Sequence, residues 1–363
     1  MRNGVQSPLG RIRIHHESGF TLVELLIAMI IFLIVTAAIF GLMQIALRSR
    51  QTVNQQVPLS KNARVALNVV GRDTYNAGFG YPLASAVILP ENRISPLLGI
   101  PPDSDATRDT VPPIIAGNNI NANTFSSTPG TMTDQVTMLF KDTTFNIVGT
   151  VGPPDTQRST PLNINAAATV AGIDEILPIS GSNASCRVND IFLVTGNTGS
   201  TIGLATALSG TDKVQFSNGD LLGLNQTGPG GPLSAITTPA SMQRVLMVTY
   251  FVTQDGILVR RRYANDNPIA PAIGVAFVDD PLVYGVEDFQ IQYVMNDGSL
   301  FDNPADPDGV PASGDEDQTR LAAVRQIRYT INLRTTDTDS TGQPVRLTMA
   351  STFSTRNLGY DAN

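Results

Sequence analysis

One stretch near the N-terminus constrains this chain more than any other. From Leu25 to Met43, nineteen successive residues carry no charge, and Thr36 is the one polar residue among them. A helix over residues 20–43, rising about 1.5 Å per residue, would be roughly 35 Å long, which is enough to cross a bilayer core of about 30 Å. We therefore expect a transmembrane segment over about residues 20–43.

The charged residues that flank this segment do not fix its orientation. Arg11 and Arg13 precede it and Arg48 and Arg50 follow it, so the basic charge is similar on both sides. A large polar region follows on the C-terminal side. We therefore expect a single-pass protein of the inner membrane, with its N-terminus in the cytoplasm and the polar region exported to the periplasm.

Composition excludes several classes of function. The 363 residues carry a net charge of −7, and the first nineteen, with three Arg against one Glu, carry +2, which leaves −9 for the rest. Such an acidic chain lacks the basic surface that nucleic acid requires.

Both histidines, His15 and His16, lie in the first nineteen residues, which excludes a His-based catalytic dyad or zinc site beyond them. Cys186 is a single cysteine, so it forms no intrachain disulfide. We expect no enzymatic activity and no resident metal or cofactor.

A small residue lies before the apolar run rather than after it. A secretory signal is cleaved after its apolar stretch, at small residues. Here Gly19 precedes the run, and the order Gly19-Phe20-Thr21-Leu22-Val23-Glu24 puts an acid in the first turns of the expected helix. A carboxylate inside a membrane is costly, so it usually serves a function and has a partner.

This segment resembles the class III signal of type IV prepilins and type II secretion pseudopilins. The resemblance implies that residues 1–19 are a leader peptide and that a prepilin peptidase cleaves between Gly19 and Phe20. It also implies that Phe20 becomes the N-methylated terminus, and that Glu24 pairs with the terminal amine of a neighbouring subunit during assembly. A freed α-amine is cationic up to about pH 8, so the two charges are complementary.

Beyond Arg48 the pattern becomes amphipathic. Apolar and small residues recur at spacings of three and four, which predicts one buried helix face; they are Leu59, Ala63, Ala66, Leu67, Val70, Thr74 and Ala77. We expect a helix of about 58 residues from Phe20 to near Ala77, within a helical region 20–78, that Pro58 kinks or briefly breaks. Gly41 is either a helix breaker or a small residue that lets helices approach closely.

The end of this helix also carries a resemblance. Residues 62–80, with Arg64, Arg72, Asp73 and the Gly78-Phe79-Gly80 turn, resemble the helix end of PilW-family minor pilins and, more loosely, that of GspJ pseudopilins. We expect Arg64, Arg72 and Asp73 to lie on a solvated helix face, with a contact between subunits as the alternative.

Residues 79–363 are expected to form a β-rich head. Residues 83–135 are rich in Pro, Asn, Ser, Thr and Gly, which favours long loops with little regular structure. Apolar and polar residues alternate in later segments, which predicts antiparallel strands at Gln135–Phe140, Ile191–Thr195, Gln243–Thr253, Ile257–Tyr263, Phe289–Met295, Val324–Arg334 and Arg346–Phe353. The Gln254-Asp255-Gly256 turn predicts a hairpin, and no long helical pattern follows Ala77. The fold class is therefore α+β.

Two C-terminal segments extend the resemblance to PilW-family minor pilins. They are Leu282–Tyr293, which resembles a strand entry, and Thr352–Asn357, which resembles the closing strand with its Arg-Asn pair. The resemblance implies a type IV pilin-like fold, in which the helix packs on an antiparallel sheet. It also implies a minor pilin that assists pilus assembly with a prepilin peptidase and N-methyltransferase, other pilins, an inner-membrane assembly platform and membrane lipid.

Three alternatives stay open from the sequence. One is a GspJ-like pseudopilin of a type II secretion system. Another is a membrane-anchored adhesin or binding protein, an alternative supported by the Asn-, Ser- and Thr-rich residues 83–135. The third concerns a ligand: the acidic segment 296–317 could hold calcium, but its spacing departs from the EF-hand pattern, and a solvated excursion between strands is the simpler expectation.

Overall fold

The computed structural model describes residues 19–82, 87–90, 93–100, 108–142, 159–160, 162–165, 168–172, 187–196, 198–209, 213–225, 236, 240–264, 276–306, 318–338 and 342–358. The chain divides into two units, Met1–Asn54 and Gln55–Asn363. Each is described by itself, and the second is called the head. The predicted α+β class, a long N-terminal helix followed by antiparallel sheets, is confirmed.

The first element is the helix α1 (Leu22–Asn76), which has 55 residues and ends close to the predicted position. Pro58 does not break it, so that part of the prediction is wrong. The Pro58 side chain is exposed, which lets the helix continue with one missing backbone donor on its solvent side. Gly41 also lies inside the helix and does not interrupt it.

In the head, α1 packs through the face that the sequence predicts. The seven positions that define this face, Leu59, Ala63, Ala66, Leu67, Val70, Thr74 and Ala77, are all buried. The small Ala residues let the backbone of the helix come close to the strands it covers.

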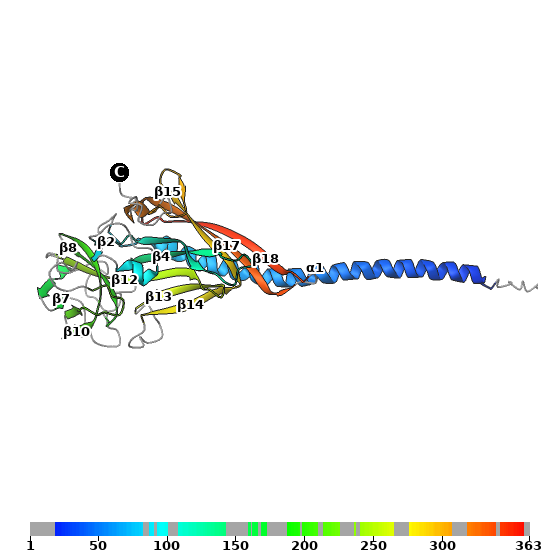
Figure 1. The fold of residues 1–363 in the computed structure, drawn as a ribbon, viewed down its shortest axis with the longest axis horizontal. Coiled ribbons are helices and arrows are strands. Elements are labelled where there is room, and N and C mark those ends of the chain that lie inside the picture. The colour runs from blue at the N-terminus through cyan, green and yellow to red at the C-terminus, as the bar shows by residue number, and fades with distance from the viewer. Residues whose placement is uncertain are drawn as a thin grey trace, which may run out of the picture. The chain divides into compact units, whose positions relative to one another are not determined.

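In the described part of the head, the larger sheet has eight antiparallel strands. Figure 1 labels several of them. They are β3 (Ile114–Ala122), β4 (Met132–Lys141), β5 (Ser159–Thr160), β8 (Ile191–Gly196), β9 (Gly199–Leu204), β12 (Ala240–Val252), β13 (Ile257–Tyr263) and β14 (Phe277–Tyr284). The main path runs β14-β13-β12-β4-β3, and the first residues of β12 also pair with β5 and with β8, whose partner is β9. The long strand β12 therefore links the parts of the sheet.

Both faces of this sheet are covered. On β12, Val248 and Tyr250 belong to the core that contains α1, whereas Val245 and Met247 belong to a second core on the opposite face. Residues of β8, of β9 and of the short helix α2 (Ile94–Leu98) complete this second core. Burial on both faces explains why β4 is buried at eight successive positions rather than at alternate ones.

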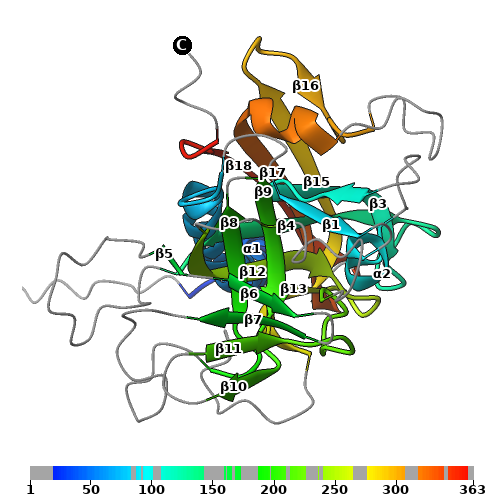
Figure 2. The same cartoon turned by 90° about the vertical axis from the view of Figure 1, so that its left-hand side faces the viewer.

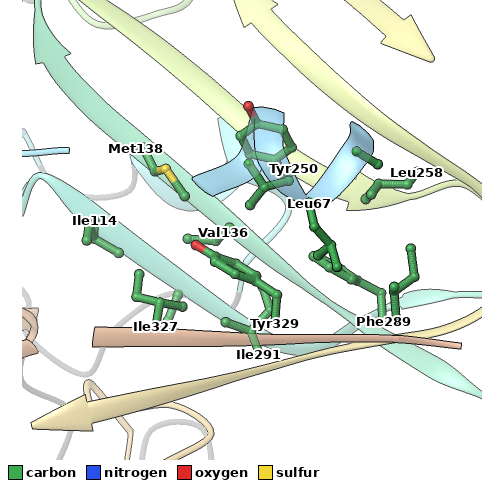
Figure 3. Packing of buried hydrophobic residues seen from close by; sticks show 14 of the residues in the cluster. Leu67, Ile114, Val136, Met138, Tyr250, Leu258, Phe289, Ile291, Ile327 and Tyr329 are labelled. Carbon is green, nitrogen blue, oxygen red and sulfur yellow. The ribbon is translucent and has the colours of Figure 1, made fainter. Parts of the chain in front are cut away.

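A second sheet packs against the same helix. Its order is β16 (Leu300–Phe301), β15 (Val286–Met295), β17 (Val324–Thr338) and β18 (Pro344–Ser354). Phe289 and Ile291 of β15 and Tyr329 of β17 lie with Leu67 of α1 in one core (Figure 3). The helix thus packs on residues of both sheets, and the Thr74 hydroxyl lies 2.8 Å from the Tyr329 hydroxyl.

The remaining strands form smaller sheets. β1 (Ile88–Pro90) pairs with β2 (Arg108–Thr110). A four-stranded sheet has the order β10 (Ala207–Ser209), β11 (Lys213–Phe216), β7 (Ala168–Gly172) and β6 (Leu162–Asn165), and these four strands lie side by side in Figure 2. The 3₁₀ helix η2 (Gln318–Ala323) precedes β17.

The head departs from the sequence prediction in its first half. Residues 83–135 were expected to form loops, but their described part contains β1, α2, β2, β3 and the start of β4. A register shift between Gly117 and Asn121, with Asn119 at φ 51°, breaks the alternation that would have marked β3. The strand β14 and the strands of the small sheets were also missed. The seven predicted strands and the Gln254-Asp255-Gly256 hairpin are confirmed.

The two C-terminal segments that resemble PilW-family pilins have distinct structures. Gly285, at φ 80°, separates β14 from β15 inside the first segment. In the second, β18 ends at Ser354, Arg356 is exposed, and the Asn357 side chain donates a hydrogen bond to the Tyr75 carbonyl of α1 at 2.7 Å. The Arg-Asn pair therefore includes a contact that ties the last strand to the helix.

Candidate functional site

The residues at the predicted cleavage position lie just before α1. Gly19, Phe20 and Thr21 precede the first helical residue, Leu22, and all are exposed; the Phe20 side chain is 87% exposed. Apart from its two neighbours in the chain, no heavy atom of the described residues lies within 4 Å of the place where a side chain of residue 19 would begin. Gly19 and Phe20 are therefore both accessible to an enzyme that would cleave the bond between them.

The first turn of α1 is closed by a reciprocal pair of hydrogen bonds. The Glu24 backbone NH donates to Thr21 Oγ1 at 3.3 Å, and Glu24 Oε2 accepts from the Thr21 NH at 2.9 Å and from its hydroxyl at 3.0 Å. This is a capping box, in which two residues satisfy the free donors of a helix terminus. Sequence reasoning missed it, although the Thr-x-x-Glu spacing is its signal.

The capping box leaves Glu24 one free oxygen. Both hydrogen bonds to the carboxylate end on Oε2, and no residue in the described part of the chain donates to Oε1. The carboxylate also lies at the N-terminus of the helix, where the helix dipole favours negative charge. Glu24 is therefore held in place by its own chain and keeps an acceptor for a cationic group.

A continuous apolar surface follows. Among the described residues, α1 is the one helix that is long and apolar enough to cross a membrane. Its large apolar side chains from Leu22 to Leu47 are each about half exposed or more, and they include Leu25, Leu26, Ile27, Met29, Ile30, Ile31, Phe32, Leu33, Ile34, Val35, Ile39, Phe40, Leu42, Met43 and Ile45. A surface of this extent requires lipid or another apolar helix as its environment.

Asp73 does not lie on a solvated face, contrary to the prediction. Its side chain is 3% exposed, and Oδ2 accepts hydrogen bonds from the Tyr250 hydroxyl at 2.6 Å and from Arg260 Nε at 2.7 Å. Burial, followed by the Asp73 charge, raises the pKa of Tyr250 far above its ordinary value, so Tyr250 stays protonated as a donor. Asp73 therefore links α1 to β12 and β13 inside the head.

Arg64 and Arg72 are exposed, as predicted. The Arg72 side chain is 67% exposed, and its Nε lies 3.4 Å from Asp73 Oδ1. These two arginines are available to solvent or to another molecule.

The candidate calcium segment is described only in part. Asp297 binds the Ser299 backbone NH and hydroxyl, Asp302 accepts from the Gln292 amide at 3.4 Å, and residues 307–317 lie outside the described residues. The described residues contain no group of three or more His, Cys, Asp or Glu that could hold a metal ion. Cys186, His15, His16 and the leader before Gly19 also lie outside the described residues.

Comparison with protein families gives one match. Residues 14–40 match the family described as "Prokaryotic N-terminal methylation motif". Neither the curated proteins nor the solved structures include a match to the chain. The motif is the signal of type IV pilins and pseudopilins, and it includes the capped first turn and most of the apolar surface. A pilin-type signal, a long apolar helix and antiparallel sheets are consistent with a type IV pilin-like fold, with membrane anchoring and with a structural rather than an enzymatic role.

Proposed function

We propose that this chain is a minor pilin of a type IV pilus, of the PilW type. The observation that supports this proposal most strongly is the match to the N-terminal methylation motif. Within that motif Gly19 and Phe20 are exposed, and hydrogen bonds to Thr21 hold Glu24 on the first turn of an exposed apolar helix. Residues 1–19 are the leader, and a prepilin peptidase removes it and methylates Phe20. The head, which begins after the membrane segment, faces the periplasm before assembly.

Assembly then depends on Glu24. Its free Oε1 accepts the methylated terminal ammonium of a neighbouring pilin, while Oε2 stays bound to Thr21. The apolar surface of α1 leaves the lipid and packs against the equivalent helices of other pilins, so the membrane segment becomes part of the filament core. An inner-membrane assembly platform drives this transfer, and the protein ends in the pilus, at its tip.

The choice of the PilW type is supported by the head. Asp73 forms a buried ion pair with Arg260, and the Asn357 side chain donates a hydrogen bond to the Tyr75 carbonyl at the end of the helix. The strand β15 begins at the segment Val286-Glu287-Asp288. All three belong to segments that resemble PilW-family pilins. A GspJ-like pseudopilin shares the N-terminal motif and would use Gly19, Phe20 and Glu24 in the same way.

The N-terminus of the mature protein tests the proposal. Mass spectrometry of the chain purified from its native membrane should find N-methylphenylalanine at position 20. Gly19→Val should leave an uncut precursor in the inner membrane. A mature chain that begins upstream of Phe20, or that has lost residues 25–43, would contradict the proposal.

A deletion strain separates the pilus role from the alternatives. We expect loss or reduction of surface pili, measured by electron microscopy of sheared filaments, and its restoration by the wild-type gene. Normal pili with lost type II secretion would identify the pseudopilin. Normal pili with lost attachment would identify the adhesin.

A further inference from the structure

The outward side of α1 in the head carries a line of basic and apolar side chains, which we call the basic stripe. Its members follow one another at spacings of three and four residues and are all exposed; they are Val57, Lys61, Arg64, Asn68, Arg72 and Tyr75. At about 100° per residue these positions fall on one side of the helix, opposite the buried face. Val57 is 60% exposed and Tyr75 is 41% exposed.

The stripe carries three positive charges, and the helix itself presents no exposed acid between Gln55 and Asn76. Asp73 is the one acidic residue between positions 55 and 80, and it is buried against Arg260. The contact of Arg72 with Asp73 leaves its side chain 67% exposed. A uniformly basic helix face is unusual in a chain of net charge −7, because solvated helices normally mix charges of both signs.

A complementary surface exists elsewhere on the head. The hairpin of β15 and β16 presents Asp297, Leu300 and Asp302, which we call the acidic tip. All three are exposed, and Leu300 is 57% exposed. Hydrogen bonds from the Ser299 hydroxyl and NH lower the pKa of Asp297, so it stays ionised. A backbone hydrogen bond from Met295 to Ser299 fixes the turn.

The two surfaces do not meet within one chain. None of the ion pairs among the described residues joins the stripe to the tip. In Figure 2 the hairpin with β16 and the helix α1 occupy different parts of the head. Each surface therefore has a complementary charge that another copy can supply.

We propose that the basic stripe of one copy docks on the acidic tip of a second copy. Lys61, Arg64 and Arg72 face the two carboxylates, and Val57, one turn before Lys61, covers Leu300. Because the two surfaces differ, the contact between the two copies is head-to-tail rather than two-fold symmetric. The proposal rests on the proposed function, since it names a contact between subunits that assembly would bring together.

Cross-linking of the full chain in its membrane tests this contact. Two differently tagged copies, both with Cys186→Ser, are co-expressed; one carries Asn68→Cys in the stripe and the other Leu300→Cys at the tip. A short bis-maleimide should join the two tags. Two sets of charge reversals test the contact: one combines Lys61→Glu, Arg64→Glu and Arg72→Glu in the first copy, and the other combines Asp297→Lys and Asp302→Lys in the second. Either set alone should lower the yield of the cross-linked product about tenfold or more. The two sets together should restore that yield.

A matched variant controls for net charge. Arg320→Glu, Arg328→Glu and Arg356→Glu change the charge by the same amount at exposed positions outside the stripe, so the cross-link should persist. No cross-link between the unaltered surfaces, equal loss in this control, or no recovery when both reversed surfaces are combined would overturn the proposal. N-terminal analysis of the same samples reports on cleavage at Gly19 separately, so failure of the proposed function is distinguishable.

Anionic lipid head groups are the competing ligand for a basic helix face, and a second arm excludes them. The purified chain with Cys186→Ser and Asn68→Cys is reconstituted in liposomes of phosphatidylcholine alone or with phosphatidylglycerol, and a water-soluble maleimide labels the introduced cysteine. Protection in phosphatidylcholine alone that Asp297→Lys and Asp302→Lys abolish supports docking on a second copy. Protection that requires phosphatidylglycerol overturns it.

Discussion

Arg260 Nε lies 2.7 Å from Asp73 Oδ2, so a residue near the end of the long helix is paired with a strand residue far away in the sequence. The Asp73 side chain is 3% exposed and that of Arg260 is 13% exposed. The Tyr250 hydroxyl binds the same carboxylate oxygen. Three elements of the head therefore depend on one carboxylate.

Asp73→Asn should destabilise the head. The substitution keeps the size of the side chain but removes the negative charge that lies 2.7 Å from Arg260 Nε, and removing one charge of a buried pair costs about 3 kcal/mol. We expect this loss in denaturant unfolding of the full chain in detergent. Arg72→Ala is the control, because an exposed arginine should cost at most about 0.5 kcal/mol. A loss below about 1 kcal/mol for Asp73→Asn would contradict this interpretation of the pair.

At Gly71 the helix comes close to the last strand. A methyl group at Gly71 would overlap the ring of Phe353 in β18. Gly71→Ala should therefore destabilise the head by about 1–3 kcal/mol through overpacking, although Ala is the better helix former by about 1 kcal/mol. In the Phe353→Leu background the same change should cost less. Unfolding of the two single variants and the double variant measures this coupling, which should be at least about 1 kcal/mol; additive effects would show that the two residues do not limit each other.

The sequence made the helix predictable because one face of it carries small and apolar residues at a regular period from Leu59 to Ala77. It made β15 and β17 predictable because each has one buried and one open face. β14 was missed because Asp279, Asp280 and Pro281 interrupt its pattern. The structure places it at the edge of the sheet, where proline is tolerated and where Arg261 and Arg262 of β13 pair with the two acids.

The roles of single residues were harder to predict. Asp73 looks like a surface acid in the sequence because its partners, Tyr250 and Arg260, are brought to it only by the tertiary fold. The Glu24 position was found from a resemblance, which identifies a pattern but not its geometry. The bond of Glu24 to Thr21 is local, and the Thr-x-x-Glu spacing contains the information needed to predict it.

Asp134 should make the stability of the head depend on pH. Burial raises the pKa of Asp134 to about 6, although the NH groups of Asn119 and Ile291 donate to its two oxygens. In the unfolded chain its pKa is near 3.9, so between about pH 4 and 6 the folded state binds more protons. The contribution of Asp134 is therefore fully present below pH 4 and is lost as pH rises through 6, by about 2–3 kcal/mol.

The measurement is denaturant unfolding at pH 4.5 and pH 7. Asp134→Asn, which cannot titrate, should remove this part of the pH dependence relative to the wild-type chain. Asp255→Asn, at the exposed hairpin turn, is the control and should leave the dependence unchanged. An unchanged pH dependence in Asp134→Asn would show that another group is responsible.

Substitutions at Thr21 and Glu24 can separate the effect of the Glu24 charge from the effect of the helix cap. Glu24→Gln keeps a side chain that can accept the Thr21 bonds but removes the charge, because Gln also serves in a capping box. Glu24→Ala removes both, and Thr21→Ala removes the hydroxyl while the charge remains. If Oε1 binds the terminal ammonium of a neighbouring subunit, the two Glu24 variants should lose incorporation equally, whereas Thr21→Ala should lose only part of it.

The fraction of the chain in sheared filaments, relative to the membrane, measures incorporation. Leader cleavage should stay largely intact in all three variants, because Gly19 and Phe20 are unchanged, and gel mobility of the precursor and mature forms checks this. Wild-type incorporation of Glu24→Gln, together with a severe defect in Thr21→Ala, would show that the cap matters rather than the charge. In that case Glu24 would act on its own helix and not on a neighbour, and the pairing of Glu24 with a second subunit would have to be abandoned.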